Sequence, residues 1–211
     1  MYIPAHFTGM STEAIHNLIE ENPLGILFAN GSGGPDANHI PFELVKAEGQ
    51  FGVLRCHVAR ANPVWKDTPT GSDVLAVFRS VDAYISPNWY PSKHETHRQV
   101  PTWNYIVAHA HGRLKVRDDE AYVRNVVARM TKAHEAAQPV PWKMADAPKD
   151  YLDKMVNSIV GLEIEITQLV GKMKLSQDDG VRDMRGASEA LAMLGNAKIA
   201  EAMLSAAKAM D

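Results

Sequence analysis

The chain has 211 residues, 45% of them hydrophobic, with a formal net charge of −3 and a pI near 6.3. This length allows one large domain or a domain with an appendage, and the composition is not that of a disordered protein. The negative charge excludes general binding to nucleic-acid phosphates, although a local basic patch stays open.

Cys56 is the only cysteine of the chain. The chain can therefore form no internal disulfide and no cysteine-based zinc site, which fits a reducing compartment. The first residues lack the charged and apolar regions of a signal peptide, and no stretch holds the roughly 20 apolar residues of a membrane span. We expect a cytoplasmic protein with no membrane partner.

The first predicted elements are a helix and three strands. The helix begins at Ser11–Ala14 and ends at Asn22–Pro23. The strands cover residues 24–29, 38–47 and 51–58. Asn30–Pro35 is the predicted turn between the first two strands. In the third strand, alternation places Cys56 on the buried face.

Further short strands follow, with helices between them. The strands cover residues 73–78, 83–86, 105–116 and 162–169. Two helices are predicted at residues 118–134 and 147–158, and the tail, residues 188–210, reads as one or two helices with a break near Gly195. Short strands joined by turns predict a barrel or a sandwich, and the apolar positions of the tail need a partner surface.

One aromatic-rich segment, Ala83–Tyr105, contains half of the tyrosines and half of the tryptophans of the chain, together with three prolines. The prolines stiffen the backbone, and the rings offer flat apolar area with polar tips. This combination suits the capture of a planar polar ligand, or a tight contact between subunits. His94 and His97 lie in its most polar stretch and are predicted to be exposed.

The segment HVARANP, which begins at His57, predicts an anion site. Asn62 is a good helix cap and Pro63 a good first helical residue, so a short helix begins there with free N–H groups. Arg60 lies beside this helix start, and Arg55 shares a strand face with His57. These groups would serve a phosphate dianion. The alternative is an ordinary capped helix with solvated charges.

Other polar residues allow a functional and a structural interpretation. His39, at a strand start, could meet the polar edge of a ligand ring or be structural. His109 and His111 point to one strand face, but no carboxylate lies near them in sequence, so packing is favoured over metal binding. Lys172 and Lys174 could neutralise a ligand charge or form a solvated strand end. No nucleophile elbow, P-loop or dinucleotide fingerprint is present, which favours a non-covalent cofactor over covalent catalysis.

Together these motifs resemble the PaiB family, described as FMN-binding negative transcriptional regulators. The resemblance covers residues 1–180 and rests on MYIPAHF, ANHIPF, LRCHVARANPVW, AVFRSVDAYISPNWYPSK, VPTWNYIVAHAHGRL, IVGLEIEI and GKMKLSQ. Asp178 stands where the family commonly has asparagine, so this position lacks the family's amide.

The resemblance implies a mainly β fold with helices (α+β), the FMN-binding split β-barrel related to pyridoxine-phosphate oxidases. The split-barrel domain would span residues 1–180, and residues 181–211 would form a helical extension packed on the barrel or on the dimer partner. It also implies a homodimer with FMN at its interface. No catalytic residue and no metal ligand is assigned.

The residues expected at the flavin divide by role. The residues that would hold the phosphate are Arg55, His57, Arg60 and Asn62, and those that would frame the ring or its substrate are His39, Trp89, Tyr90 and Trp103. Lys93 and Lys174 could stabilise a reduced anionic flavin. The full set is His39, Arg55, His57, Arg60, Asn62, Trp89, Tyr90, Lys93, Thr102, Trp103, Asn104 and Lys174.

Four functions follow as alternatives. The first is a flavoprotein, possible as an FMN-dependent oxidoreductase on an unknown small-molecule substrate. The second is a transcriptional regulator that acts on DNA directly or indirectly, with Arg182, Arg185, Lys198 and Lys208 of the tail as the best basic candidates among acidic neighbours. The third is a haem-binding or haem-degrading split barrel. The fourth is a structural dimer that has lost its flavin.

Overall fold

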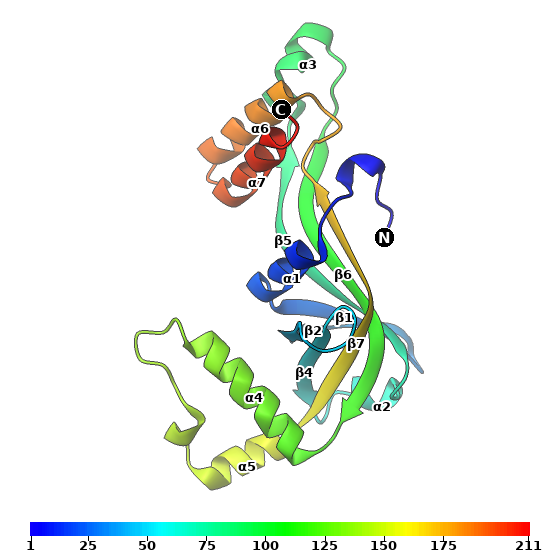
Figure 1. The fold of residues 1–211 in the computed structure, drawn as a ribbon, viewed down its shortest axis with the longest axis vertical. Helices are drawn as coiled ribbons and strands as arrows, with labels where there is room; N and C mark the ends of the chain where they lie inside the picture. The colour runs from blue at the N-terminus through cyan, green and yellow to red at the C-terminus, as the bar shows by residue number, and fades with distance from the viewer. The chain divides into compact units, whose positions relative to one another are not determined.

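Seven strands form one sheet in the order β2-β1-β5-β6-β7-β4-β3 in the computed structural model, which describes residues 1–211 (Figure 1). The strands are β1 (Leu24–Gly31), β2 (Gly34–Pro41), β3 (Glu43–Val45), β4 (Val53–Ala59), β5 (Asp73–Ile85), β6 (Thr102–Arg117) and β7 (Ile159–Lys174). The recorded pairs, β1 with β2 and β5, and β4 with β3 and β7, are antiparallel. The predicted α+β class is confirmed, with a sheet that stays open because β2 and β3 are its two edges.

Seven α-helices accompany the sheet: α1 (Thr12–Glu21), α2 (Val64–Asp67), α3 (Pro91–Thr96), α4 (Glu120–Glu135), α5 (Lys149–Asn157), α6 (Val181–Met193) and α7 (Ala197–Lys208). Three short 3-10 turns cover Ala5–Phe7, Pro87–Trp89 and Met144–Asp146. None of the helices has the length and apolar character needed to cross a bilayer.

The boundaries of several elements differ from the sequence prediction. The two strands expected at residues 73–78 and 83–86 are one strand, β5, because the polar residues between them occupy partly exposed strand positions. The strand expected at residues 38–47 is interrupted at Phe42, whose ring is buried and whose N–H donates to Pro23 O at 2.8 Å. The aromatic segment, expected as a loop, contains the helix α3.

The chain divides into two compact units. The first unit contains residues 1–18, 79–108 and 170–211, and the second contains residues 19–78 and 109–169. The strands β5, β6 and β7 contribute residues to both.

The core of the first unit joins the aromatic segment to the helical tail. Ile85 and Tyr90 pack with Leu175 of the last strand's end and with Leu191 and Met203 of α6 and α7. All five side chains are buried. The tail therefore contributes core residues to this unit, as its apolar pattern required.

The core of the second unit lies on the inner face of the sheet. Cys56 is fully buried opposite Leu162, which confirms its predicted orientation. The Phe42 and Phe78 rings meet edge to face, with centroids 5.4 Å apart. Gly25 lies against both rings, and a Cβ there would come within 2.7 Å of Phe78 Cε1.

Candidate functional site

Arg60, in the second unit, is held by four hydrogen bonds. Its Nη1 and Nη2 donate to the two carboxylate oxygens of Asp118 at 3.0 and 2.6 Å. Its Nε donates to Asn157 O at 2.8 Å, and Nη2 also donates to Ile159 O at 3.1 Å. The hydrogen bonds from Arg60 lower the pKa of the Asp118 carboxyl. A guanidinium has five N–H groups, so one N–H on Nη1 is left to engage a ligand.

Asn62 lies just before the short helix α2, whose N-cap position is occupied by Pro63 and not by Asn62 as predicted. Its Oδ1 accepts a hydrogen bond from Val64 N at 2.9 Å, and its Nδ2 donates to Asn38 Oδ1 at 2.7 Å. The Asn38 amide in turn donates to Asp36 at 2.8 Å. Pro63 precedes α2 rather than beginning it, and α2 is a single turn. Because its first amide is already bonded to Asn62, this helix start has little to offer an anion.

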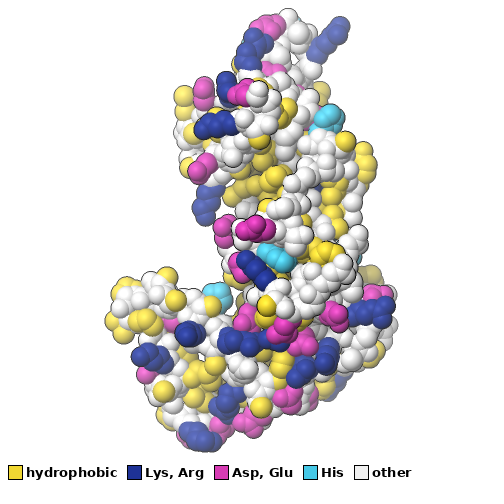
Figure 2. All heavy atoms as spheres, in the orientation of Figure 1, with side chains coloured by type: hydrophobic (Ala, Val, Ile, Leu, Met, Phe, Trp, Pro, Cys, Tyr) yellow, Lys and Arg dark blue, Asp and Glu magenta, His cyan; other side chains and the backbone are white.

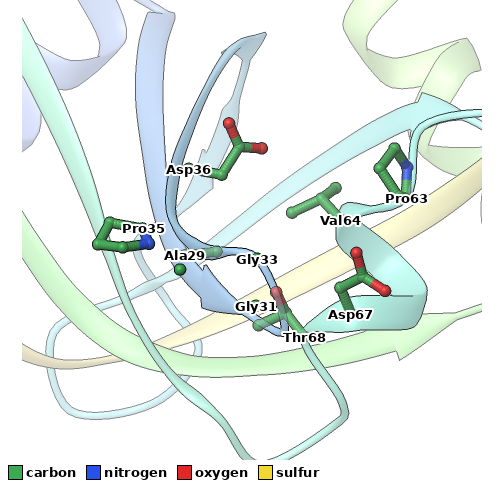
Figure 3. A pocket seen from close by; sticks show the side chains of 10 residues that line it. Ala29, Gly31, Gly33, Pro35, Asp36, Pro63, Val64, Asp67 and Thr68 are labelled. Atoms are coloured by element: carbon green, nitrogen blue, oxygen red, sulfur yellow. The ribbon is translucent and has the colours of Figure 1, made fainter.

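A hollow of about 380 Å³ lies between the β1–β2 turn and α2 (Figure 3). Two carboxylates, Asp36 and Asp67, line it, and no ion pair involves either of them. Thr68 also lines it; this residue is 1% exposed, and its Oγ1 has no hydrogen-bond partner. Two unneutralised carboxylates would repel a phosphate dianion, so the hollow beside Asn62 is not a phosphate site.

The other residues predicted for the phosphate take separate partners. Arg55 Nη2 donates to both carboxylate oxygens of Glu48, at 2.9 and 2.6 Å, and Nε lies 3.4 Å from Glu163 Oε2. His57 is half-buried and lines an apolar pocket, and burial lowers its pKa. His39, which was predicted to frame the flavin ring or its substrate rather than the phosphate, is exposed on β2, opposite Ile26 of β1. The structure therefore does not gather these three side chains around one point.

In the first unit, two lysines of β7 lie among aromatic rings. The Nζ of Lys174 donates to Trp103 O at 2.8 Å and to Thr102 Oγ1, and burial lowers the pKa of this ammonium. Lys172 is buried, with its Nζ 5.2 Å from the Tyr105 ring centroid and 5.7 Å from that of Phe7. Such spacings are those of cation–π contacts. Lys172 is thus not part of a solvated strand end.

An exposed aromatic pair lies next to Lys174. Tyr84 of β5 and Trp103 of β6 meet edge to face, with centroids 6.1 Å apart. These side chains are 44% and 56% exposed. The Lys174 Nζ contacts the main-chain oxygen of Trp103, and the ring over which it lies is that of Phe7, with the centroid 5.9 Å away. Single exposed aromatics are ordinary, but a paired platform is suited to a flat ring or to a second protein surface.

Two further predicted residues of the aromatic segment, Tyr90 and Asn104, are buried, and a third, Trp89, packs against the core. The Tyr90 hydroxyl lies 2.7 Å from Ser176 Oγ, and the buried Asn104 amide donates to the same Oγ at 3.0 Å. Trp89 packs against the core of the first unit. Lys93 is half-buried on α3, and His94 and His97 are exposed, as predicted.

The sequence did not predict Tyr84 as the partner of Trp103, nor Asp118 as the partner of Arg60. Tyr84 carried a signal, because it belongs to the aromatic segment and precedes a buried strand position. Asp118 carried none, since its partner Arg60 lies 58 residues earlier. His109 and His111 lie on one strand, with ring centroids 6.3 Å apart, but no group of three or more potential ligands is placed to hold a metal ion.

Comparison with known proteins identifies the family. Residues 1–168 match the family described as "Putative FMN-binding domain". The chain is 30% identical to "Protease synthase and sporulation protein PAI 2" of Bacillus subtilis over 90% of this chain and 89% of that protein. It is 34% identical to an uncharacterized protein of Saccharomyces cerevisiae over 66% of this chain and 93% of that one.

Solved structures share the fold at low sequence identity. The FAD and heme binding protein of Mycobacterium smegmatis has a TM-score of 0.58 and 15% identity, covering 79% of this chain and 72% of that one. The flavocytochrome Anf3 of Azotobacter vinelandii has a TM-score of 0.58 and 13% identity, covering 82% and 72%. The aligned chain and the open seven-stranded sheet agree: this protein belongs to the FMN-binding domain family and has a split-barrel fold.

Proposed function

We propose that this protein is an FMN-binding flavoprotein with a redox or regulatory role. The observation that carries the proposal is the exposed Tyr84–Trp103 platform beside Lys174. Bound FMN would supply electron transfer, and the protein would supply orientation and charge. Trp103 and Tyr84 would give flat contact area to the ring, and Lys174 would hold positive charge close to it.

The residues present fit the chemistry of FMN. Arg60, in the second unit, is a separate candidate for binding an anion such as a phosphate, because one of its N–H groups has no partner and its side chain is 41% exposed. Asp118 fixes the Arg60 guanidinium in place, so the guanidinium would already be oriented when an anion binds. Thr102 holds the Lys174 ammonium at the strand end, which keeps that charge beside Trp103.

We infer a homodimer as the working form. The exposed aromatic platform leaves apolar area in water, and the sheet has two open edges. A second copy of the chain would cover such a surface. Light scattering after size exclusion measures the mass directly: about twice 23.2 kDa is expected, and a mass of one chain would count against the dimer.

Regulation through direct DNA binding has less support than a redox or indirect role. On the tail, Arg182 pairs with Glu95 at 2.7 Å, and Arg185 pairs with Asp211, so two of the four basic candidates are neutralised. Figure 2 shows Lys and Arg mixed with Asp and Glu over the face drawn, without a continuous basic stripe. A gel shift with DNA upstream of its own gene, repeated at rising salt, separates direct binding from an indirect effect.

The test of the cofactor is a titration of the purified protein with FMN, followed by visible absorbance and by quenching of flavin fluorescence. Saturable binding is expected, with weaker binding by Trp103→Leu and Lys174→Met. Trp142→Leu, a similarly exposed tryptophan in the second unit, is the matched control. Absence of any binding by the unmodified protein would show the proposal to be wrong. A parallel haem titration with a flat Soret region would exclude the haem alternative.

A further inference from the structure

A second pocket, distinct from the aromatic platform, lies entirely in the second unit. Its volume is about 400 Å³, and its walls come from β4, α4, α5, the start of β7 and the connection between the two helices. Figure 1 shows α4 and α5 side by side, with this connection looping between them. The size is that of a small-molecule site, which commonly measures about 300–1,000 Å³.

The walls are apolar and carry no charge. Ala59, Leu152, Met155 and Ile159 line the pocket together with the ring of Trp142. No carboxylate, ammonium or guanidinium is among the lining residues. The hydroxyl of Ser158, which also lines it, is already committed to Lys154 O at 2.8 Å. A charged ligand would therefore lose its hydration here without a partner.

His57 is the lining residue that can offer a polar group to a ligand in this otherwise apolar pocket. Its Nδ1 is buried and has no hydrogen-bond partner. A buried N–H without an acceptor is rarer than a buried acceptor atom without a donor. The unpartnered Nδ1 is therefore assigned as the unprotonated nitrogen, and the ring proton is on Nε2. Since Nδ1 is enclosed and the ring lines the pocket, Nε2–H is the ring N–H that is left for a ligand in the pocket. Burial also lowers the pKa of His57, which keeps the ring neutral.

Apolar side chains stay partly in water at the edge of this pocket. Trp142 is 43% exposed, and Met155 is also exposed. Figure 2 shows hydrophobic side chains gathered around the connection between α4 and α5. A partly open apolar pocket with one unpaired donor and an apolar rim is the pattern of a site for an uncharged ring compound.

We propose that this pocket binds a neutral, flat or alicyclic small molecule that carries one acceptor oxygen, such as a ketone or quinone carbonyl, and that His57 Nε2–H donates to this oxygen. The site goes beyond the FMN proposal and does not depend on it, since none of its residues belongs to the aromatic platform.

The test uses Prodan, a neutral naphthyl ketone whose emission moves to longer wavelength when its carbonyl accepts a hydrogen bond. The full-length protein is expected to bind one Prodan per chain. His57→Phe removes the donor and keeps an apolar ring, and should weaken binding by about three- to tenfold, the value of one hydrogen bond, with a blue-shifted emission. His57→Gln restores an N–H donor and should recover both.

Two further variants separate this pocket from other surfaces. Ala59 lines the pocket and is exposed on β4, so Ala59→Phe fills the cavity without entering the core and should abolish binding. His94→Phe, an exposed histidine of the other unit, should change nothing. Equal affinity of the protein and of its His57→Phe and Ala59→Phe variants would overturn the proposal, as would unchanged emission without the donor. FMN titration of the same variants is expected to match the unmodified protein, so failure of one proposal is distinguishable from failure of the other.

Discussion

The buried polar contact between Tyr90 and Ser176 should hold the aromatic segment in place. The Tyr90 hydroxyl lies 2.7 Å from Ser176 Oγ, which also accepts a hydrogen bond from Asn104 at 3.0 Å. Ser176 has a left-handed backbone conformation, with φ of 68°, which is uncommon for residues other than glycine. The perturbation is Tyr90→Phe, which deletes one hydroxyl from a side chain that is 1% exposed.

The expected loss of stability follows from that one bond. A buried hydrogen bond contributes about 1 kcal/mol net, and the Ser176 oxygen keeps the hydrogen bond that it accepts from Asn104. For a chain of this size, about 1 kcal/mol lowers the melting temperature by about 2–4 °C. In a cycle with Ser176→Ala, the coupling between the two hydroxyls should be about 0.5–1.5 kcal/mol.

The pH dependence gives an independent check. Burial is the largest cause that raises the pKa of Tyr90 from 10.0 to about 12. The neutral phenol is therefore favoured in the folded state, and its contribution is complete below pH 10 and is lost as the pH rises through about 12. The Phe variant lacks this loss, so the stability difference between the two proteins should shrink over that range.

Urea unfolding followed by tryptophan fluorescence measures both effects for the protein, the two single variants and the double variant. A coupling free energy indistinguishable from zero would refute the reasoning. So would a Tyr90→Phe variant that is as stable as the unmodified protein at neutral pH.

Three other predictions concern the second unit. Gly25→Ala places a Cβ 2.7 Å from Phe78 and should destabilise by about 1–3 kcal/mol in the same urea assay, whereas unchanged stability would mean that the ring moves freely. Arg60 lowers the pKa of Asp118, so this carboxylate stabilises the fold above its ordinary pKa of 3.8 and less as the pH falls; Asp118→Asn should flatten the acid limb of a stability–pH profile, and an unaltered limb would contradict the pairing. Cys56 is fully buried and its pKa is raised by burial, so a thiol reagent should label it only at the rate of unfolding; immediate labelling of the folded protein would argue against its position.

Local sequence patterns determined most of the elements of this protein. The capping residues and the Asn22–Pro23 stop placed α1, alternation placed β4 with Cys56 inward, and the break near Gly195 separated α6 from α7. Each of these depends on residues that are neighbours in the chain. The strand ends were less well predicted, because hydrogen bonds from adjacent strands extended β5, β6 and β7 beyond their apolar cores.

The motifs also determined the family. Segments such as HVARANP and VPTWNY identify it by their order of residues, and this does not require knowing which groups those residues contact. Which of these residues are buried and which stay exposed was decided by the tertiary structure alone. Tyr90 and Asn104 read as ring contacts, yet the packing of α6 and α7 encloses them. Lys174 and Trp103 lie together at the surface beside Tyr84.

The charged residues show most clearly the difference between what the sequence determined and what the tertiary structure decided. The sequence alone determined that Arg55 and Arg60 flank a strand end and a short helix, as a phosphate site requires. Their partners, Glu163 and Asp118, lie 108 and 58 residues away. Ion pairing depends on which strands and helices become neighbours, and no local pattern records that. The tertiary structure therefore decided that Arg55 pairs with Glu48 and Glu163 through Nη2 and Nε, that Arg60 keeps one N–H without a partner, and that His57 faces an apolar pocket.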